Sequence, residues 1–303
     1  MANKTIGDLL ADFELKHARK RHANENKRAK NKEIQQLETK KRTLLLKKLE
    51  CAFLVDGSSD EYDQEIQELE ETQKKIEQEQ GISVAYDCAV CEDTGVVNGQ
   101  YCNCFLKEIY CQIFHAIDPD TLAIKDMDVT IFDHTEAIID DLTQLDLVKI
   151  AYGIGDRYIS DFPATRKQNM LILGKTGLGK TWLLHNMAAK ANRKKIDTCL
   201  IRSNALFEAF FKHRMGEDIP LAFLKNADLL MIDDLGTEPI TQNVTIEYFF
   251  DLLNYRLEEK KHTIIATNID DLQKRYDDRI YSRLKDTSRC LTLRFSGQDL
   301  RLK

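Results

Sequence analysis

Proline and long apolar runs are both scarce in this sequence of 303 residues. Its four prolines stand at positions 119, 163, 220 and 239, so no proline interrupts a helix in the first 118 residues. No apolar run approaches the ~20 residues of a membrane span, and the first residues lack the apolar stretch of a signal peptide. We therefore expect a cytoplasmic protein without a membrane partner, whose N-terminal part can form long helices.

The net charge of the whole chain is small, but positive and negative residues are concentrated in different segments. The net charge is −6. Residues 1–50 hold 14 Lys/Arg against 7 Asp/Glu, residues 51–165 hold 6 against 25, and residues 166–303 hold 24 against 18. The two basic segments could meet an anionic partner such as nucleic acid, whereas the acidic middle would repel it. For residues 1–50, solvated helix faces explain the same charges equally well.

Disulfides are not expected among the eight cysteines of a cytosolic chain, so clustered cysteines indicate a metal. Four cysteines lie within 17 residues, at Cys88, Cys91, Cys102 and Cys104. Four thiolates can close a tetrahedral Zn²⁺ site, which would be structural because no position is left for a reacting water. Four reduced cysteines without a metal are the alternative. Cys111 and His115 follow closely and are reserve ligands.

The most specific motif is a phosphate loop, G-x-x-x-x-G-K-[ST], at residues 174–181. An apolar, strand-like run precedes it and a helix-forming run follows it, which is the context the motif needs. Loop glycines let backbone N–H groups face phosphate oxygens, Lys180 would reach the β- and γ-phosphates, and Thr181 would bind Mg²⁺. The predicted nucleotide-binding residues are Gly174, Lys175, Thr176, Gly177, Leu178, Gly179, Lys180, Thr181 and Trp182.

Apolar strands and helical stretches alternate from residue 166 onward. The predicted strands are 170–173, 198–201, 228–232, 263–267 and 290–295. The predicted helices start at Lys180, at Ser203 and near Val244. Five apolar strands with helical crossovers predict an α/β fold with a parallel five-stranded sheet that is buried on both faces. A ligand then binds at the carboxyl ends of the strands.

Polar residues follow two of these strands. Asp233 is placed to hold Mg²⁺ through its water shell, and Asp234 could orient or deprotonate the attacking water. Asn268 ends another strand, where an amide can bind the γ-phosphate or the attacking water; a turn cap is the alternative. The sequence therefore predicts hydrolysis of a nucleoside triphosphate at this edge of the sheet.

Two arginines, Arg279 and Arg283, lie four residues apart on one face of a predicted helix. An arginine that faces the nucleotide of a neighbouring subunit would stabilise the charge of the transferred phosphate, which requires an oligomer. A surface ion pair with Asp277 or Asp278 is the alternative. Arg301 is a further candidate for the nucleotide site.

Taken together, these motifs resemble an AAA+ ATPase, and more narrowly the bacterial replicative helicase loaders of the DnaC/DnaI type. Residues 233–238 (Asp-Asp-Leu-Gly-Thr-Glu) resemble the acidic strand end of that family, and Asn268 matches its sensor position. Arg283 resembles its arginine finger, and Arg301 resembles its second sensor. The run Cys-x-x-Cys-x-Asp-Thr-Gly from residue 88 is similar to the knuckle of loader-like proteins.

This resemblance implies an ATPase that loads the hexameric replicative helicase onto single-stranded DNA when replication begins. Its ATPase domains would self-associate, and its helices and zinc knuckle would bind the helicase. The helix after Ser203 resembles the DNA-contacting region, with Lys212 and Arg214 as phosphate contacts. Phe207, Phe210 and Phe211 could stack on bases, but their i, i+3, i+4 spacing favours a core role.

The predicted organisation has four parts. Residues 1–80 form a helical hairpin or coiled-coil arm that is a candidate for docking to the helicase, and residues 81–115 form the zinc knuckle. Residues 116–165 form an acidic connector, and residues 166–303 form the AAA+ P-loop domain. A transposition-helper ATPase of the IstB type is the alternative function, although the arm and the knuckle argue against it. A small-molecule kinase and a non-catalytic ATP switch are further alternatives.

Overall fold

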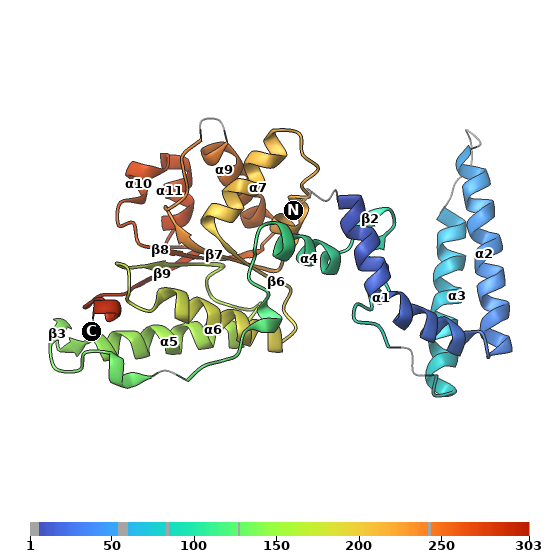
Figure 1. The fold of residues 1–303 in the computed structure, drawn as a ribbon, viewed down its shortest axis with the longest axis horizontal. Helices are drawn as coiled ribbons and strands as arrows, with labels where there is room; N and C mark the ends of the chain where they lie inside the picture. Colours follow the sequence, from blue (N-terminus) through green and yellow to red (C-terminus); the bar gives the residue numbers. More distant parts are fainter. Residues whose placement is uncertain (1–5, 54–59, 83–84, 127, 242–243, 303) are drawn as a thin grey trace. The chain divides into compact units, whose positions relative to one another are not determined.

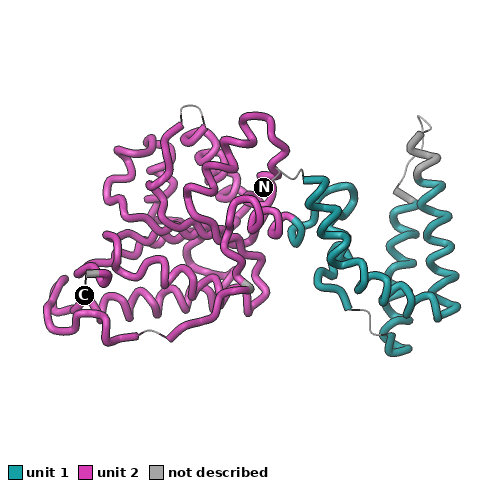
Figure 2. Tube along the Cα trace, viewed as in Figure 1, with its two compact units in different colours: residues 1–105 teal, residues 106–303 magenta. Residues whose placement is uncertain are grey.

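The computed structural model describes residues 6–53, 60–82, 85–126, 128–241 and 244–302. The chain divides into two compact units, Met1–Phe105 and Leu106–Lys303, shown in teal and magenta in Figure 2. Within the described residues, no helix is both long and apolar enough to cross a membrane. Each unit has its own core, and each is described separately below.

The first unit is built from long helices, as the absence of proline allows. It contains α1 (Ile6–Arg28), α2 (Lys32–Phe53), α3 (Asp60–Glu79) and a ribbon of β1 (Val96–Val97) with β2 (Gln100–Tyr101). Figure 1 shows α2 and α3 side by side. Ile34, Leu44 and Leu69 are buried in this hairpin. Ion pairs between the basic α2 and the acidic α3, such as Lys40 with Glu65, add charge complementarity at its surface.

The second unit is an α/β fold with a parallel five-stranded sheet, as the sequence predicts. Its five parallel strands lie in the order β6-β7-β8-β5-β9. The strands are β5 (Asn169–Leu173), β6 (Thr198–Arg202), β7 (Leu229–Leu235), β8 (His262–Thr267) and β9 (Cys290–Arg294). Every residue of β5 and β8 is buried, as helices on both faces of a parallel sheet require.

Helices cover both faces of this sheet (Figure 1). On one face lie α5 (Gln144–Asp161) and α6 (Lys180–Arg193). On the other face lie α7 (Ser203–Arg214), α9 (Thr245–Glu258), α10 (Leu272–Arg275) and α11 (Asp278–Lys285). The remaining elements are the helices α4 (Asn103–Ile113) and α8 (Ala222–Asn226), the short 3₁₀ turns η1 (Pro119–Thr121), η2 (Val129–Ile131) and η3 (Leu300–Leu302), and a hairpin of β3 (Ala137–Ile139) with β4 (Leu142–Thr143).

Helix α5 is an integral part of this core although it lies in the acidic segment of the chain. A capping box between Thr143 and Asp146 starts the helix. Its apolar face contributes Val148, Ala151 and Ile159 to the core cluster around α6 and β5. The acidic side chains of the segment therefore line the outside of an element whose other face anchors the phosphate-loop helix.

A single arginine ties α9 to the sheet. Arg256 is fully buried and donates hydrogen bonds to four backbone carbonyls and to the hydroxyl of Thr263. Burial lowers the pKa of Arg256 to about 10. Because several donors of the guanidinium are paired, the buried charge is tolerated and fixes the position of α9 beside β8.

Candidate functional site

The phosphate loop connects the buried strand β5 to α6, at the carboxyl edge of the sheet. Gly177 and Gly179 adopt φ angles of +74° and +93°, in the left-handed region that favours glycine. Lys180 is 6% exposed, and its Nζ donates hydrogen bonds of 2.7 Å to the carbonyls of Gly174 and Lys175. Burial lowers the pKa of Lys180, and the charges of Asp234 and Asp233 oppose this shift. The loop is thus folded around its own lysine.

The acidic end of β7 faces the first turn of α6. Asp233 is 2% exposed, and its Oδ1 accepts hydrogen bonds from Thr181 Oγ1 at 3.2 Å and from the Asp234 backbone N–H at 3.0 Å. Burial raises the pKa of Asp233, and the charge of Asp234 raises it further. A hydroxyl and a carboxylate at this distance are oxygen ligands of the kind that Mg²⁺ prefers. The two residues predicted to hold Mg²⁺ are therefore in direct contact.

Asp234 has an unusual backbone that its neighbours hold in place. Its φ is +55°, which is uncommon for a residue other than glycine. Its carbonyl accepts hydrogen bonds from Ser203 Oγ at 2.8 Å and from Thr237 Oγ1 at 3.0 Å. Such over-determined strain concentrates at functional sites, because several contacts fix a side chain in a direction that ordinary backbone would not give it.

Asn268 belongs to the same edge of the sheet. It directly follows β8, whose last residue, Thr267, pairs with Leu173 of β5 in parallel register. Thr267 Oγ1 donates to the carbonyl of Leu235 at 2.6 Å and so ties the end of β8 to β7. The structure therefore brings Asn268 to the strand ends that carry Gly174 and the acidic pair.

The two predicted finger arginines lie on α11 and stack on a phenylalanine of α9. The guanidinium groups of Arg283 and Arg279 lie 4.3 and 4.8 Å from the ring centre of Phe250. Arg283 also donates from Nε and Nη2 to Asn254 Oδ1, at 3.1 and 2.8 Å. Arg279 forms an ion pair of 2.6 Å with Asp277, as the alternative interpretation of this pair expected. Both arginines are thus held by α9 and α11.

Arg301 lies in η3, which packs on the phosphate loop. The backbone N–H of Leu300 donates to the carbonyl of Gly177 at 3.0 Å. The charge of Arg301 contributes to the lowered pKa of Lys180, after the larger effect of burial. The structure therefore brings Arg301 to the neighbourhood of the loop, although 120 residues separate it from Thr181.

Trp182 and two residues that the sequence analysis did not select surround the start of α6. The ring of Trp182 lies 4.4 Å from that of Tyr152 on α5. His185 has a buried Nε2 without a hydrogen-bond partner among the described residues, and burial lowers its pKa while the charge of Asp233 acts in the opposite direction. Its position four residues after Thr181, on the same helix face, was a signal that could have found it.

The four predicted zinc ligands gather in the first unit. Their Sγ atoms all lie within 4.8 Å of one another, with 3.8 Å between Cys88 and Cys102 and 3.4 Å between Cys91 and Cys104. Sulfurs bound tetrahedrally at about 2.3 Å from Zn²⁺ are roughly 3.8 Å apart, so the donor set fits this ion. Within the described part of the chain, the cluster does not include Cys111 or His115.

A buried carboxylate supports the cysteine cluster from behind. Asp93 is fully buried, and its two oxygens accept the backbone N–H groups of Cys88 at 2.8 Å and Asp87 at 3.2 Å. Its carbonyl accepts a hydrogen bond from Arg21 of α1. His17 lies 3.3 Å from Asp87, whose other oxygen pairs with Lys20. These contacts of His17 and Lys20 with Asp87 hold α1 against the knuckle.

Helix α7 carries three phenylalanines, but one of them is exposed to solvent. Phe207 and Phe210 are buried in the core, as their spacing favoured, whereas Phe211 is 46% exposed. Lys212 pairs with Glu208 at 3.2 Å, while the side chain of Arg214 is exposed. The exposed end of the helix thus combines one aromatic ring with cationic side chains.

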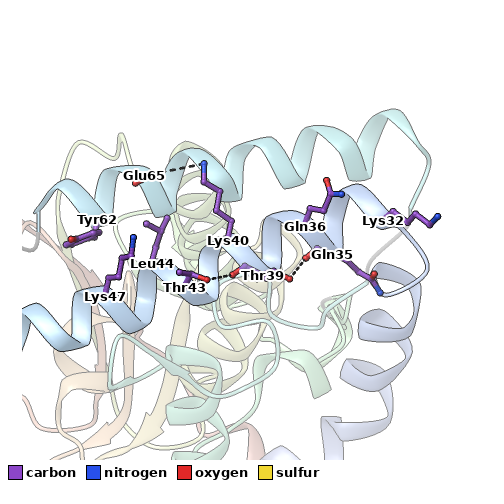
Figure 3. Close-up of a pocket in the computed structure, with 10 residues that line it drawn as sticks. All are labelled: Lys32, Gln35, Gln36, Thr39, Lys40, Thr43, Leu44, Lys47, Tyr62 and Glu65. Atoms are coloured by element: carbon purple, nitrogen blue, oxygen red, sulfur yellow. Dashed lines mark hydrogen bonds and ion pairs between the residues drawn. The ribbon is translucent and has the colours of Figure 1, made fainter.

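An open groove of about 780 Å³ runs along α2 and α3 of the first unit (Figure 3). Lysines and amide side chains of α2 line it, and Tyr62 and Glu65 of α3 close its other side. Figure 3 shows Lys40 reaching across the hairpin to Glu65. Most residues that line the groove are polar or charged, and the groove lies in the arm that the sequence predicts to be a docking element.

Comparison with known proteins relates the second unit to several ATP-binding proteins. A family model described as "IstB-like ATP binding protein" matches residues 142–280. A putative ATP-binding protein of insertion sequence IS232 from Bacillus thuringiensis subsp. berliner is 30% identical over 123 residues, which cover 39% of this chain and 48% of that protein. The chain thus spans about half the length of this curated relative.

Two solved structures have a similar fold. A putative primosome component from Streptococcus pyogenes serotype M3 has 19% identity and a TM-score of 0.43, over 56% of this chain and 86% of its own. The DnaC helicase loader has 21% identity and a TM-score of 0.42, over 54% of this chain and 94% of its own.

Proposed function

We propose that this chain binds ATP with Mg²⁺ and hydrolyses it. The contact between Thr181 and Asp233 carries the proposal, because it joins the phosphate loop to the acidic end of β7 in one site. When nucleotide binds, Lys180 moves its hydrogen bonds from the loop carbonyls to phosphate oxygens. Thr181 directly and Asp233 through the water shell would hold Mg²⁺, which would neutralise charge on the phosphates. Asp234 and Asn268 orient the attacking water, and Asp234 accepts its proton.

The role that fits both units is loading of the replicative helicase onto single-stranded DNA during initiation. In this proposal, residues 1–80 and the zinc knuckle of residues 81–115 dock on the hexameric helicase. The groove along α2 and α3 offers lysines and amides for this contact. The segment 116–165 leads into the ATPase domain of residues 166–303 and contributes α5 to its core. The ATPase domain self-associates and grips the strand through Lys212 and Arg214 of α7.

A transposition-helper ATPase of the IstB type is the second candidate. The match of residues 142–280 to the IstB-like family model and the similarity to an insertion-sequence protein support it. The cysteine cluster and the helices of the first unit lie outside the matched residues, and they support the loader instead. The two functions share the ATPase site and differ in the protein that the chain engages.

Co-purification distinguishes these candidates. The full chain is mixed with the replicative helicase of its host, and in parallel with a transposase of the same host, each with and without ATP. The loader proposal expects ATP-responsive capture of the helicase that is lost when residues 1–105 are deleted. Capture of the transposase alone would assign the chain to transposition. ATP turnover measured with and without single-stranded DNA serves as the common activity readout.

A further inference from the structure

Residues 295–301 lie directly on the phosphate loop and bring a carboxylate to it. A side-chain Cβ added to Gly177 would fall 1.6 Å from Asp299 Oδ1, so Asp299 occupies the space where a side chain at this loop position would stand. Next to it, the Leu300 N–H donates to the Gly177 carbonyl at 3.0 Å. The glycine at position 177 is therefore required not only by its positive φ but also by the approach of Asp299.

Several contacts hold this segment in place. Gln144, which is fully buried at the start of α5, donates from Nε2 to the carbonyl of Gln298 at 3.0 Å. Its Oε1 accepts the N–H of Gln298 at 3.3 Å, so one amide side chain pairs with both backbone groups of a single residue. Asp299 Oδ1 also accepts the Arg301 N–H at 2.9 Å. The carboxylate is thus presented to the loop by a clamped backbone.

The position of this carboxylate has an electrostatic consequence. The amides of a phosphate loop and the N-terminus of the following helix attract anions, and a triphosphate brings several negative charges to them. A fixed carboxylate against Gly177 repels those charges at close range. Lys180 does not neutralise it, because its ammonium group is turned onto the carbonyls of Gly174 and Lys175.

We propose that Asp299 is a further residue of the nucleotide site, which lowers the affinity for ATP and is displaced with residues 296–301 when ATP binds. This inference rests on the proposed binding of ATP at residues 174–181. Residues 296–301 would then report whether the phosphate loop is occupied. When they move, the hydrogen bond from the Leu300 N–H to the Gly177 carbonyl is lost.

Titration of the full chain with ATP and Mg²⁺ tests the effect on affinity. Asp299→Asn removes the charge and keeps the shape and the acceptor for the Arg301 N–H. We expect its Kd for ATP to fall about tenfold, with a gain that shrinks as salt rises. Asp251→Asn, which removes an exposed charge of α9, is the matched control and should leave the Kd unchanged. An unchanged Kd in Asp299→Asn would overturn the proposal, and a weaker one would show that Asp299 contacts the nucleotide favourably.

Hydrogen exchange tests the displacement on the same wild-type protein. The amides of residues 296–301 should be protected without nucleotide and exchange faster with saturating ATP and Mg²⁺. Equal or slower exchange with ATP would overturn this part. The two levels of failure are distinguishable: a wild-type chain that binds no ATP refutes the proposed function and the inference with it, whereas a wild-type chain that binds ATP no more weakly than Asp299→Asn refutes the inference alone.

Discussion

Lys180 is the residue of the phosphate loop whose side chain should contribute strongly to the affinity for ATP. Its ammonium is buried and satisfied by two carbonyls, so it is poised to exchange them for phosphate oxygens. We expect Lys180→Ala to weaken ATP binding at least ~100-fold, because a buried charge-assisted contact to the triphosphate is lost. Calorimetric titration measures the Kd. Lys149→Ala, an exposed lysine of α5, is the control and should bind as the wild type does. Retained affinity in Lys180→Ala would contradict the loop assignment.

We expect the buried carboxylate of Asp233 to lower the free energy of unfolding and to be necessary for ATP turnover. Burial raises its pKa, so the folded chain binds its proton more readily than the unfolded chain, and stability falls as the pH rises from the ordinary Asp pKa through this raised value. At neutral pH the ionised, buried carboxylate remains a net cost.

We therefore expect Asp233→Asn to stabilise the nucleotide-free chain at pH 7 by on the order of 1 kcal/mol and to abolish Mg²⁺-dependent ATP turnover. Thermal unfolding over pH 4–8 measures the first effect, and the gain should shrink toward acidic pH. Thr181→Val, which removes the hydroxyl that Asp233 accepts from, should impair turnover without this pH-dependent gain. If Asp233→Asn is instead less stable than the wild type, the hydrogen bonds that the carboxylate accepts stabilise the fold by more than its burial destabilises it.

At the scale of secondary-structure elements, the cysteine knuckle is the clearest target. Its four thiols converge at spacings that suit Zn²⁺, and Asp93 fixes the backbone that carries Cys88. We expect one zinc per chain by elemental analysis and a loss of helix docking, seen as a lower melting temperature of the first unit, when the metal is chelated. Cys104→Ser should lose the metal, whereas Cys111→Ser should keep it. A chain without zinc whose thiols all react freely would remove the site.

Helix α7 offers a test of DNA binding within one element. Only Phe211 of the three phenylalanines is free to stack on a base, and base stacking contributes about 1–3 kcal/mol. We expect Phe211→Ala to weaken single-stranded DNA binding by roughly that amount and Phe211→Trp to retain it. Arg214→Ala should lower the salt dependence of binding by about one counterion. Equal DNA affinity in all three variants, measured by fluorescence anisotropy, would place the DNA contact elsewhere.

The elements that sequence reasoning predicted best are those whose signals are local. The phosphate loop and the five strands are contiguous runs, and the structure contains them in the expected order. Helix α5 was not predicted as part of the core, because its segment is rich in acidic residues. Its apolar positions, such as Val148 and Ile159, nevertheless line the core. The spacing of the α7 phenylalanines was compatible with burial of all three, but only packing against neighbours decides that Phe211 lies at the edge.

Contacts between distant parts of the chain could not be predicted from local pattern. Asp299 reaches Gly177 across 122 residues, and Gln144 clamps Gln298 across 154. Neither side chain belongs to a motif, and an exposed-looking aspartate is ordinary in a polar segment. Such residues become visible only when the fold has placed the C-terminal segment on the loop. The catalytic roles of Asp234, Asn268 and Arg283 are still predictions, which depend on the nucleotide and on a neighbouring subunit.

At the scale of the whole molecule, assembly decides whether the site is complete. Arg283 is presented on α11 by Phe250 and Asn254, so in one chain it is held by α9. If Arg283 completes the site of a neighbour, each active site draws its loop and its arginine from different chains. An arginine finger supplied in this way accelerates hydrolysis by about 10³–10⁵-fold. Arg283→Ala should then bind ATP normally and lose turnover, while Arg279→Ala, which stacks on the same ring, should keep most of it.

Mixing two inactive variants makes this test decisive. Lys180→Ala lacks a working loop but keeps Arg283, and Arg283→Ala has the reverse defect. In an equal mixture, a loop-competent chain meets an arginine-competent neighbour at roughly a quarter of the interfaces, if the interfaces are heterologous and assembly is random. ATP turnover should therefore recover to about that fraction of the wild-type rate at saturating protein concentration. A mixture as inactive as its components would assign Arg283 to its own chain, because a residue that acts only within its chain cannot be complemented by a partner.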